Sequence, residues 1–318
     1  MYLRQALKIE HDWWRYLVGL MIILFAWQFI GSVPLIVGLL MNVSSFADIP
    51  MDIGGMSEAL GSNSFLFLML ISFAIGFVGL IVVIKFIHKQ SLRHLTTSRE
   101  KVDWKRIFFA FLFWGIISSG MVLADYYFNP EGYVFNFNLE PFLILCAIAI
   151  ILVPIQTSFE EYLFRGYLMQ GIGTMVKNKW LPLVITSVVF GLLHLANPEV
   201  DKLGYVIMVY YIGTGFFLGI MTLMDEGLEL AIGFHAANNL FTALLVTADW
   251  TAFQTHSVFK DMSDPTEMGV AEIFVPVFVV FPILLLIFAK VYKWKNWKEK
   301  LFGDIKEYPK EDYKILED

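Results

Sequence analysis

The chain of 318 residues contains one cysteine, Cys146, and only 16% of its residues are charged. A single cysteine excludes an internal disulfide framework and a cysteine metal cluster. Hydrophobic residues make up 58% of the chain, and the mean hydropathy of +0.65 lies outside the range of ordinary soluble domains. The net charge of −6 is spread over short segments and forms no basic surface for nucleic acid. We therefore expect the lipid bilayer to surround this protein, and we expect no nucleic-acid partner.

The apolar residues are gathered into long stretches. A helix needs about 20 apolar residues to cross a hydrocarbon core of roughly 30 Å. We place candidate spans at residues 16–41, 64–86, 107–128, 141–168, 181–197, 203–224, 228–248 and 271–292. The sequence contains no internal repeat, and no polar segment between the spans is long enough to bury a core of its own. The sequence predicts an all-α, polytopic membrane protein of about eight transmembrane helices, forming a single domain over residues 1–318.

Basic residues fall almost entirely on one side of this predicted bilayer. If the amino terminus is cytoplasmic, only Lys202 and Lys260 of the 23 Lys and Arg residues lie in outside loops. Cytoplasmic loops retain basic residues because these resist translocation. Both termini are therefore predicted to be cytoplasmic, with residues 293–318 forming a cytoplasmic tail.

A few ionisable side chains occur inside the predicted spans. Such groups cost several kcal/mol in a bilayer, so those that remain there are candidates for function. Glu161 and Arg165 are four residues apart, the spacing and order that favour an ion pair on one helix face. Glu160 points about 100° away and has no basic neighbour at helical spacing. An unpaired carboxylate in a low dielectric suits a general acid or base.

Three further polar side chains lie on the fifth and seventh predicted spans. His194 ends the segment 190–194, and His235 and Asn239 are one helical turn apart. At about 1.5 Å of rise per residue, these three side chains and Glu160 fall in one layer between the cytoplasmic face and the midplane. We expect them to meet in a site that opens toward the cytoplasm. A lone histidine or asparagine also serves as a hydrogen-bonding partner between membrane helices, and the acidic run also fits a charge cluster at a helix end.

The three polar segments, taken in order, resemble the pattern EExxxR, FxxxH, HxxxN of the CPBP (CAAX protease and bacteriocin-processing, or Abi) intramembrane endopeptidases. This family includes the type II CAAX prenyl endopeptidases. The chain has EEYLFR at 160–165, FGLLH at 190–194 and HAANN at 235–239. The resemblance covers a core of about residues 140–250, while the first three helices and the last carry no motif.

The resemblance implies hydrolysis of peptide bonds within the membrane. Glu160 and His194 would activate a water, His235 and Asn239 would stabilise the oxyanion, and the Glu161–Arg165 pair would give structural support. The substrates implied are membrane-associated peptides, either lipidated or of the pheromone and bacteriocin type, with a link to bacteriocin immunity. We expect a bacterial plasma-membrane enzyme.

The metal requirement of such a site is open, because the family is described both as metalloproteases and as metal-free glutamate proteases. A zinc ion would use Glu160, His194 and His235. A catalytic zinc usually takes three protein ligands and leaves a separate general base, whereas this set would consume the base. We favour a site without a cofactor, with zinc as the alternative.

Two other functions compete with proteolysis. A non-catalytic scaffold or chaperone would keep the fold and bind partner membrane proteins. A proton-coupled transporter would use the intramembrane Glu and His as a relay, and it is expected to show inverted repeats, which this sequence lacks.

Overall fold

The computed structural model describes residues 1–267 and 269–307 and confirms a helical, polytopic membrane protein. In this part of the chain, six segments form helices that are long and apolar enough to cross a membrane. They are Trp13–Asn42, Ser62–Phe86, Trp104–Phe128, Leu139–Val176, Tyr205–Asp225 and Val270–Tyr292. Each corresponds to one of the expected spans.

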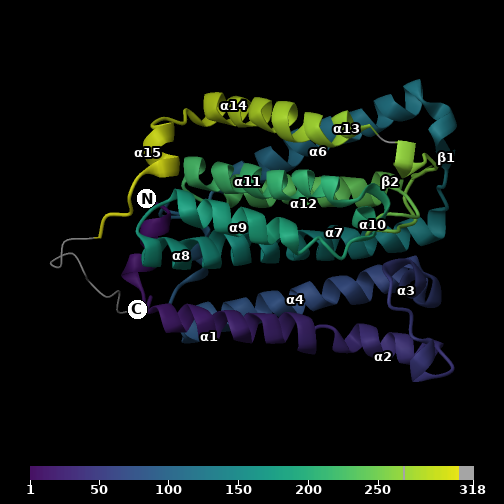
Figure 1. Cartoon of the computed structure of the whole chain (residues 1–318), viewed down its shortest axis with the longest axis horizontal. Coiled ribbons are helices and arrows are strands. Elements are labelled where there is room, and N and C mark those ends of the chain that lie inside the picture. Colours follow the sequence, from purple (N-terminus) through teal and green to yellow (C-terminus); the bar gives the residue numbers. More distant parts are fainter. Residues whose placement is uncertain (268, 308–318) are drawn as a thin grey trace.

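The other two expected spans form shorter helices inside the bundle (Figure 1). They are α9, Trp180–Leu192, and α12, Glu229–Leu245. The helix predicted to reach residue 197 ends at Leu192, and the chain continues in turns with i→i−3 hydrogen bonds as far as Asn197, where Pro198 disfavours the helical conformation. Non-helical backbone is tolerated at membrane depth where protein buries it or where it lines a cavity.

The remaining helices complete the bundle. The first span consists of α1, Trp13–Leu24, a π-helical turn, Phe25–Ile30, and α2, Val33–Asn42. The others are α3, Ile53–Leu60; α4, Ser62–Phe86; α5, Leu92–Thr96; α6, Trp104–Phe128; α7, Leu139–Glu161; α8, Met169–Val176; α10, Pro198–Leu203; α11, Met208–Asp225; α13, Val270–Val275; α14, Phe281–Tyr292; and α15, Trp297–Phe302. A π-helical turn, Tyr162–Leu168, joins α7 to α8, and another, Pro276–Val280, joins α13 to α14.

A small sheet, not expected from the sequence, lies at one end of the bundle. Its described strands are β1, Tyr133–Phe135; β2, Val246–Thr247; and β3, Phe259–Asp261, in the order β1–β3–β2. β1 runs antiparallel to β3, with Tyr133 opposite Asp261, and β2 runs parallel to β3, with Val246 opposite Phe259. The sheet ties the loop after α12 to the loop between α6 and α7.

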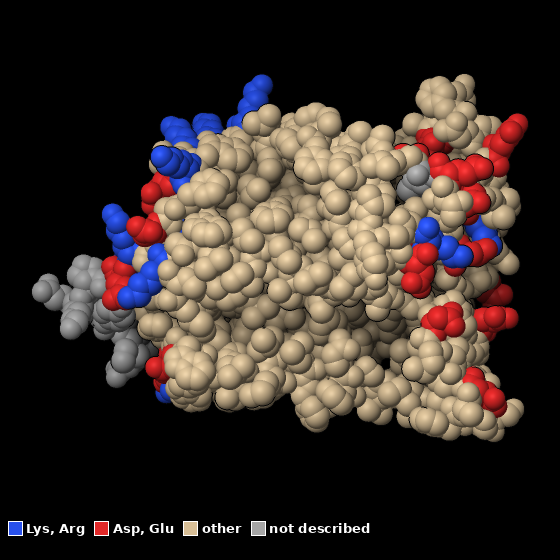
Figure 2. Space-filling view, viewed as in Figure 1, with Lys and Arg blue, Asp and Glu red and all other residues tan. Residues whose placement is uncertain are grey.

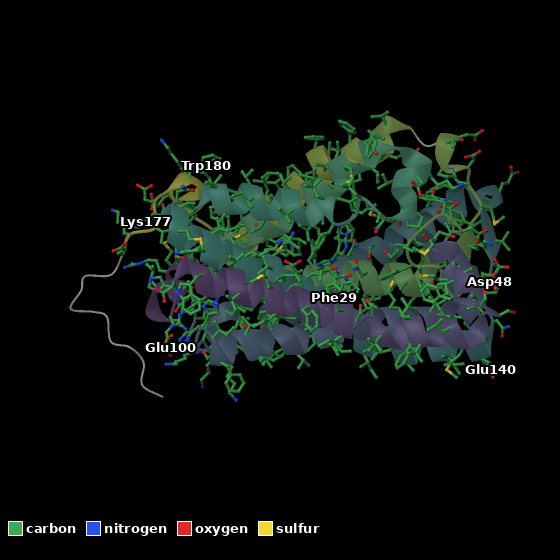
Figure 3. The ribbon with its side chains drawn as sticks, turned by 60° about the horizontal axis from the view of Figure 1, so that its bottom comes forward. Phe29, Asp48, Glu100, Glu140, Lys177 and Trp180 are labelled. Carbon is green, nitrogen blue, oxygen red and sulfur yellow. The ribbon has the colours of Figure 1, made fainter. Side chains whose placement is uncertain are left out.

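The two ends of the bundle differ in charge. Figure 2 shows Lys and Arg gathered at the end where α1 begins, which we call the basic end. Asp and Glu predominate at the opposite end, which we call the acidic end and which carries the sheet. The belt between them is uncharged, and Figure 3 places Phe29, 67% exposed, within it. An exposed apolar belt between two charged ends is the surface that a bilayer covers.

The amino terminus and the described part of the carboxyl tail meet at the basic end. The Met1 amino group lies 3.9 Å from Glu226 Oε2, and Lys300 Nζ lies 3.2 Å from Glu226 Oε1. The tail folds as α15 and buries Leu301. Residues 308–318 of the predicted tail lie outside the described residues.

Close helix packing positions the polar segments. α12 packs on α6 and α7, α4 on α7, and α11 on α9. At the last contact a Cβ on Gly191 would lie 2.9 Å from the backbone nitrogen of Ile212, and a Cβ on Gly215 would lie 2.6 Å from Ser187 O. The two glycines therefore allow α9 and α11 to approach closely, which brings Tyr211 against the residues that follow α9.

Candidate active site

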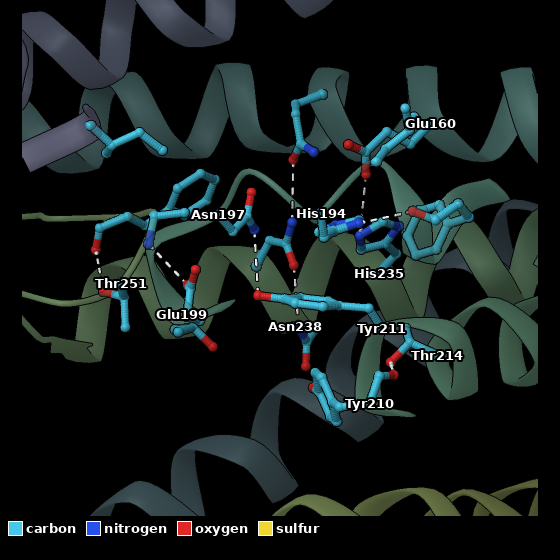
Figure 4. Close-up of a pocket in the computed structure, with 18 of the residues that line it drawn as sticks. Glu160, His194, Asn197, Glu199, Tyr210, Tyr211, Thr214, His235, Asn238 and Thr251 are labelled. Carbon is cyan, nitrogen blue, oxygen red and sulfur yellow. Dashed lines mark hydrogen bonds and ion pairs between the residues drawn. The ribbon is translucent and has the colours of Figure 1, made fainter. Parts of the chain in front are cut away.

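A cavity of about 420 Å³ lies in the middle of the bundle. Its walls come from α7, α11, α12, the turn after α9 and the loop that follows β2 (Figure 4). Glu160, His194, His235 and Asn239, which the sequence placed at one depth, all line it. Segments that lie far apart in the sequence therefore bring these polar groups to one cavity.

Two adjacent carboxylates at the end of α7 take different partners. Glu161 and Arg165 have fully buried side chains, and Arg165 Nη1 lies 3.0 Å from Glu161 Oε1, so the ion pair expected from the spacing is present. Arg165 Nη2 donates to Gly215 O at 3.2 Å, and the guanidinium lies 4.1 Å from the centre of the Phe190 ring. Arg165 thus ties α7 to both α9 and α11.

His235 lies between the two carboxylates. Its Nδ1 is 2.8 Å from Glu161 Oε1, and its Nε2 is 3.5 Å from Glu160 Oε2. Since a carboxylate only accepts, the Nδ1 proton points to Glu161 and Nε2 faces Glu160. Glu161 Oε1 therefore accepts from His235 as well as from Arg165, and the sequence spacing predicted only the second partner.

His194 occupies the turn after α9 rather than the helix itself. Its Nδ1 is 2.9 Å from Phe190 O, which requires the proton on Nδ1 and leaves Nε2 as a lone pair. The imidazole stacks on the Tyr211 ring, with centroids 4.4 Å apart and an interplanar angle of 21°. No hydrogen bond joins His194 to Glu160 among the described residues, so the carboxylate is closer to His235 than to the histidine predicted to share its water.

Amide side chains form the wall next to Glu160. Asn239 Nδ2 donates to Gln156 Oε1 at 3.3 Å, and Asn239 Oδ1 accepts from Asn238 Nδ2 at 3.2 Å. Asn238 Oδ1 in turn accepts from Trp114 Nε1 at 3.1 Å. Gln156 was not singled out from the sequence, although it lies one turn before Glu160 on the same helix. This chain of hydrogen bonds fixes which atom of each amide faces the cavity.

The cavity extends away from the predicted side. Beyond the polar cluster its walls are Ile53, Glu199, Asp261 and residues 246–248 and 250–253, which belong to elements at the acidic end (Figure 1). Toward the basic end, buried side chains such as Leu163 and Tyr167 fill the core. The expected opening toward the basic end, which was predicted to face the cytoplasm, is therefore not observed. The depth of a residue along its helix does not determine the side on which a cavity opens, because that depends on the packing around the site.

The three residues suggested as zinc ligands lie in the cavity but are not grouped around one point. Glu160, His194 and His235 all line the cavity, but within residues 1–267 and 269–307 no three His, Cys, Asp or Glu side chains are grouped so as to hold a metal ion. His235 Nδ1 is already directed at Glu161. The described geometry does not form the alternative zinc set.

Comparison with known proteins agrees with the motifs. A family model described as type II CAAX prenyl endopeptidase Rce1-like matches residues 139–241, which contain all three motifs. The chain is 32% identical over 237 residues to the uncharacterized protein YyaK of Bacillus subtilis, an overlap of 74% of this chain and 78% of YyaK. An uncharacterized protein of Mycoplasma capricolum is 31% identical over 124 residues, 38% of this chain and 34% of that protein. No solved structure matches. The chain belongs to the CPBP family of CAAX-type intramembrane proteases, whose Rce1-like domain it carries.

Proposed function

We propose that this protein is an intramembrane endopeptidase that hydrolyses membrane-associated peptides with a water activated by Glu160. The observation that carries the proposal is the position of His235, held by Glu161 at 2.8 Å and facing Glu160 at 3.5 Å in the cavity. A carboxylate and an imidazole so arranged form an acid–base pair. Membership of a protease family supports the same activity.

The proton positions give each group a role. A 3.5 Å contact between Glu160 Oε2 and His235 Nε2 is attractive only when one of the two atoms carries a proton. Glu160 takes a proton from water as the water oxygen bonds to the scissile carbonyl carbon. The same proton then passes to the leaving amine as the C–N bond breaks. The lone pair on His194 Nε2 is a second acceptor that orients the water.

The developing oxyanion needs hydrogen-bond donors. His235 Nε2–H and Asn239 Nδ2 are the donors available on α12, and Glu161 keeps the imidazole oriented by accepting from Nδ1. A preorganised donor of this kind contributes a factor of about 10²–10³ to the rate, and a general base about 10²–10⁴. These donors and the general base support hydrolysis without a cofactor, which is the route we favour.

The cavity favours an apolar peptide in an extended conformation. Trp27, Phe73, Phe190 and Phe253 line it together with the polar cluster. Hydrophobic peptides, whether lipidated or of the pheromone and bacteriocin type, are the substrates we propose. The relative in Bacillus subtilis supports a bacterial plasma membrane as the location.

The test is cleavage of a fluorogenic lipidated or hydrophobic peptide by purified protein in detergent. Wild type, Glu160→Gln and His194→Ala would be compared, with Glu140→Gln as a control, because Glu140 is an exposed acid at the start of the same helix. We expect turnover by wild type and the control, loss in the other two variants, and no effect of a chelator.

Other outcomes separate the alternatives. Full activity in Glu160→Gln contradicts a Glu160-centred mechanism. Stoichiometric zinc, with activity lost to a chelator and restored by metal, contradicts the route without a cofactor. No turnover on a broad peptide panel, with a cellular phenotype that survives Glu160→Gln, supports a scaffold.

A further inference from the structure

The cavity continues past His194 to polar groups that the proposed hydrolysis does not use. Figure 4 shows Asn197, Glu199 and Thr251 on the side away from Glu160. Together with Trp250, which also lines the cavity, we call these four residues the Glu199 subsite. The subsite lies at the acidic end, where the cavity reaches the loop after β2.

Glu199 has one oxygen satisfied and one unsatisfied. Its Oε1 accepts from the Ala252 backbone N–H at 2.9 Å, which anchors the carboxyl to the loop. Its Oε2 and Trp250 Nε1 are shielded from solvent, and neither has a hydrogen-bond partner of good geometry among the described residues, although the Tyr211 hydroxyl lies close enough to interact with the Glu199 carboxyl. Buried polar atoms are nearly always paired, and leaving one unpaired is costly. Glu199 Oε2 therefore retains the capacity to accept a hydrogen bond from a further donor.

Tyr211 connects the subsite to the reacting groups. Its ring stacks on His194, and its hydroxyl accepts from Asn197 Nδ2 at 3.4 Å and lies near the Glu199 carboxyl. The length of one tyrosine side chain therefore separates His194 from Glu199. That separation corresponds to about two or three residues of an extended peptide.

The charge of the cavity selects the sign of the group that fits. Three carboxyl residues, Glu160, Glu199 and Asp261, line it, whereas no Lys or Arg does in the part of the chain that the structure describes. A low-dielectric cleft lined by charges of one sign concentrates ligands of the opposite sign. The subsite is therefore unsuited to an anionic group such as a terminal carboxylate and suited to a cation.

We propose that Glu199 is a specificity-determining residue, which binds an ammonium or guanidinium group of the peptide two or three residues from the scissile bond. This inference rests on the proposed peptidase function and names its substrate class, apolar peptides that carry a positive charge near the cleavage site. The cation is either a Lys or Arg side chain or the free amino terminus of the peptide.

The experiment measures binding separately from turnover. Labelled apolar peptides, each with one Lys at a different position or with norleucine there, would be titrated into detergent-purified Glu160→Gln protein. A parallel arm would compare free and acetylated amino termini. Because a hydrogen bond to a charged group is strong, we expect one cationic form to bind about tenfold more tightly than its neutral counterpart. The arm that shows this gain identifies the source of the cation.

Second substitutions in the same background assign the gain to Glu199. Glu199→Gln keeps an acceptor for Ala252 N–H and should abolish the preference. Glu58→Gln removes an exposed acid at the same end, outside the cavity, and should retain it. Equal preference in both variants, or no preference for any cationic peptide, overturns the proposal. If the preference for cationic peptides depends on Glu199 but the wild-type protein cleaves none of these peptides, the result counts against the peptidase function and not against the Glu199 subsite.

Discussion

Removing one partner of the buried Glu161–Arg165 pair tests the construction of the site most directly. Both side chains are fully buried, and Arg165 also donates to Gly215 O. Arg165→Met leaves the Glu161 carboxylate buried with His235 as its remaining charge-stabilising partner. Breaking a buried pair in this way costs about 3–5 kcal/mol of unfolding free energy. At about 2 °C of Tm per kcal/mol, the Tm should fall by about 6–10 °C.

The double variant carries the sharper prediction. Glu161→Gln alone leaves a buried guanidinium and should cost as much as Arg165→Met. Combining the two substitutions removes both charges, while the glutamine oxygen still accepts from His235 Nδ1. The double variant should therefore be more stable than either single variant, because an uncompensated buried charge costs more than a lost pair.

The assay is thermal unfolding in detergent, followed by circular dichroism. Lys177→Met is the control, since its pair with Glu307 at 2.7 Å is largely exposed and should contribute less than about 1 kcal/mol. The reasoning is refuted if Arg165→Met is as stable as this control. It is also refuted if the destabilisations of the two single variants simply add in the double variant.

Three further predictions follow from the cavity and its supports. Asn239→Ala removes a proposed oxyanion donor and should lower kcat by about 10²–10³ with a small change in KM; a change confined to KM would assign Asn239 to binding. Gly191→Ala places a Cβ 2.9 Å from the backbone nitrogen of Ile212 and should lower stability by about 1–3 kcal/mol, measured as a fall in Tm; an unchanged Tm would contradict the close α9–α11 contact. Burial raises the pKa of Glu199 above its ordinary value, so the preference for cationic peptides should be lost as pH falls, at a higher pH than for an exposed glutamate; a preference constant down to pH about 4 would contradict this assignment.

The sequence alone determined the membrane spans, the Glu161–Arg165 pair and the family. Apolar stretches of membrane length and the one-sided placement of basic residues follow from the properties of the bilayer, which acts on each segment separately. The Glu161–Arg165 pair was equally predictable, because residues four apart on a helix are neighbours whatever surrounds them. The ordered motifs likewise identified the family from short local patterns.

Helix ends and ion pairs between distant segments were not predicted from local sequence patterns. α9 stops at Leu192 and passes into turns, although the apolar pattern predicted a span to residue 197. Arg99, in the segment between α4 and α6, pairs with Asp225 and Glu229 at 2.8 and 3.1 Å. Those partners lie more than a hundred residues away, so no local pattern revealed the pairing.

Only the tertiary structure decided how the site is arranged. His235 reaches Glu161 across 74 residues, and Glu199 meets Ala252 across 53. The cavity extends toward the acidic end because side chains of the core fill the space on the other side of Glu160. Spacing along a helix gives the depth and the face of a side chain. Its partners, and the direction in which a cavity opens, depend on how separate helices pack, and that information is not local in the sequence.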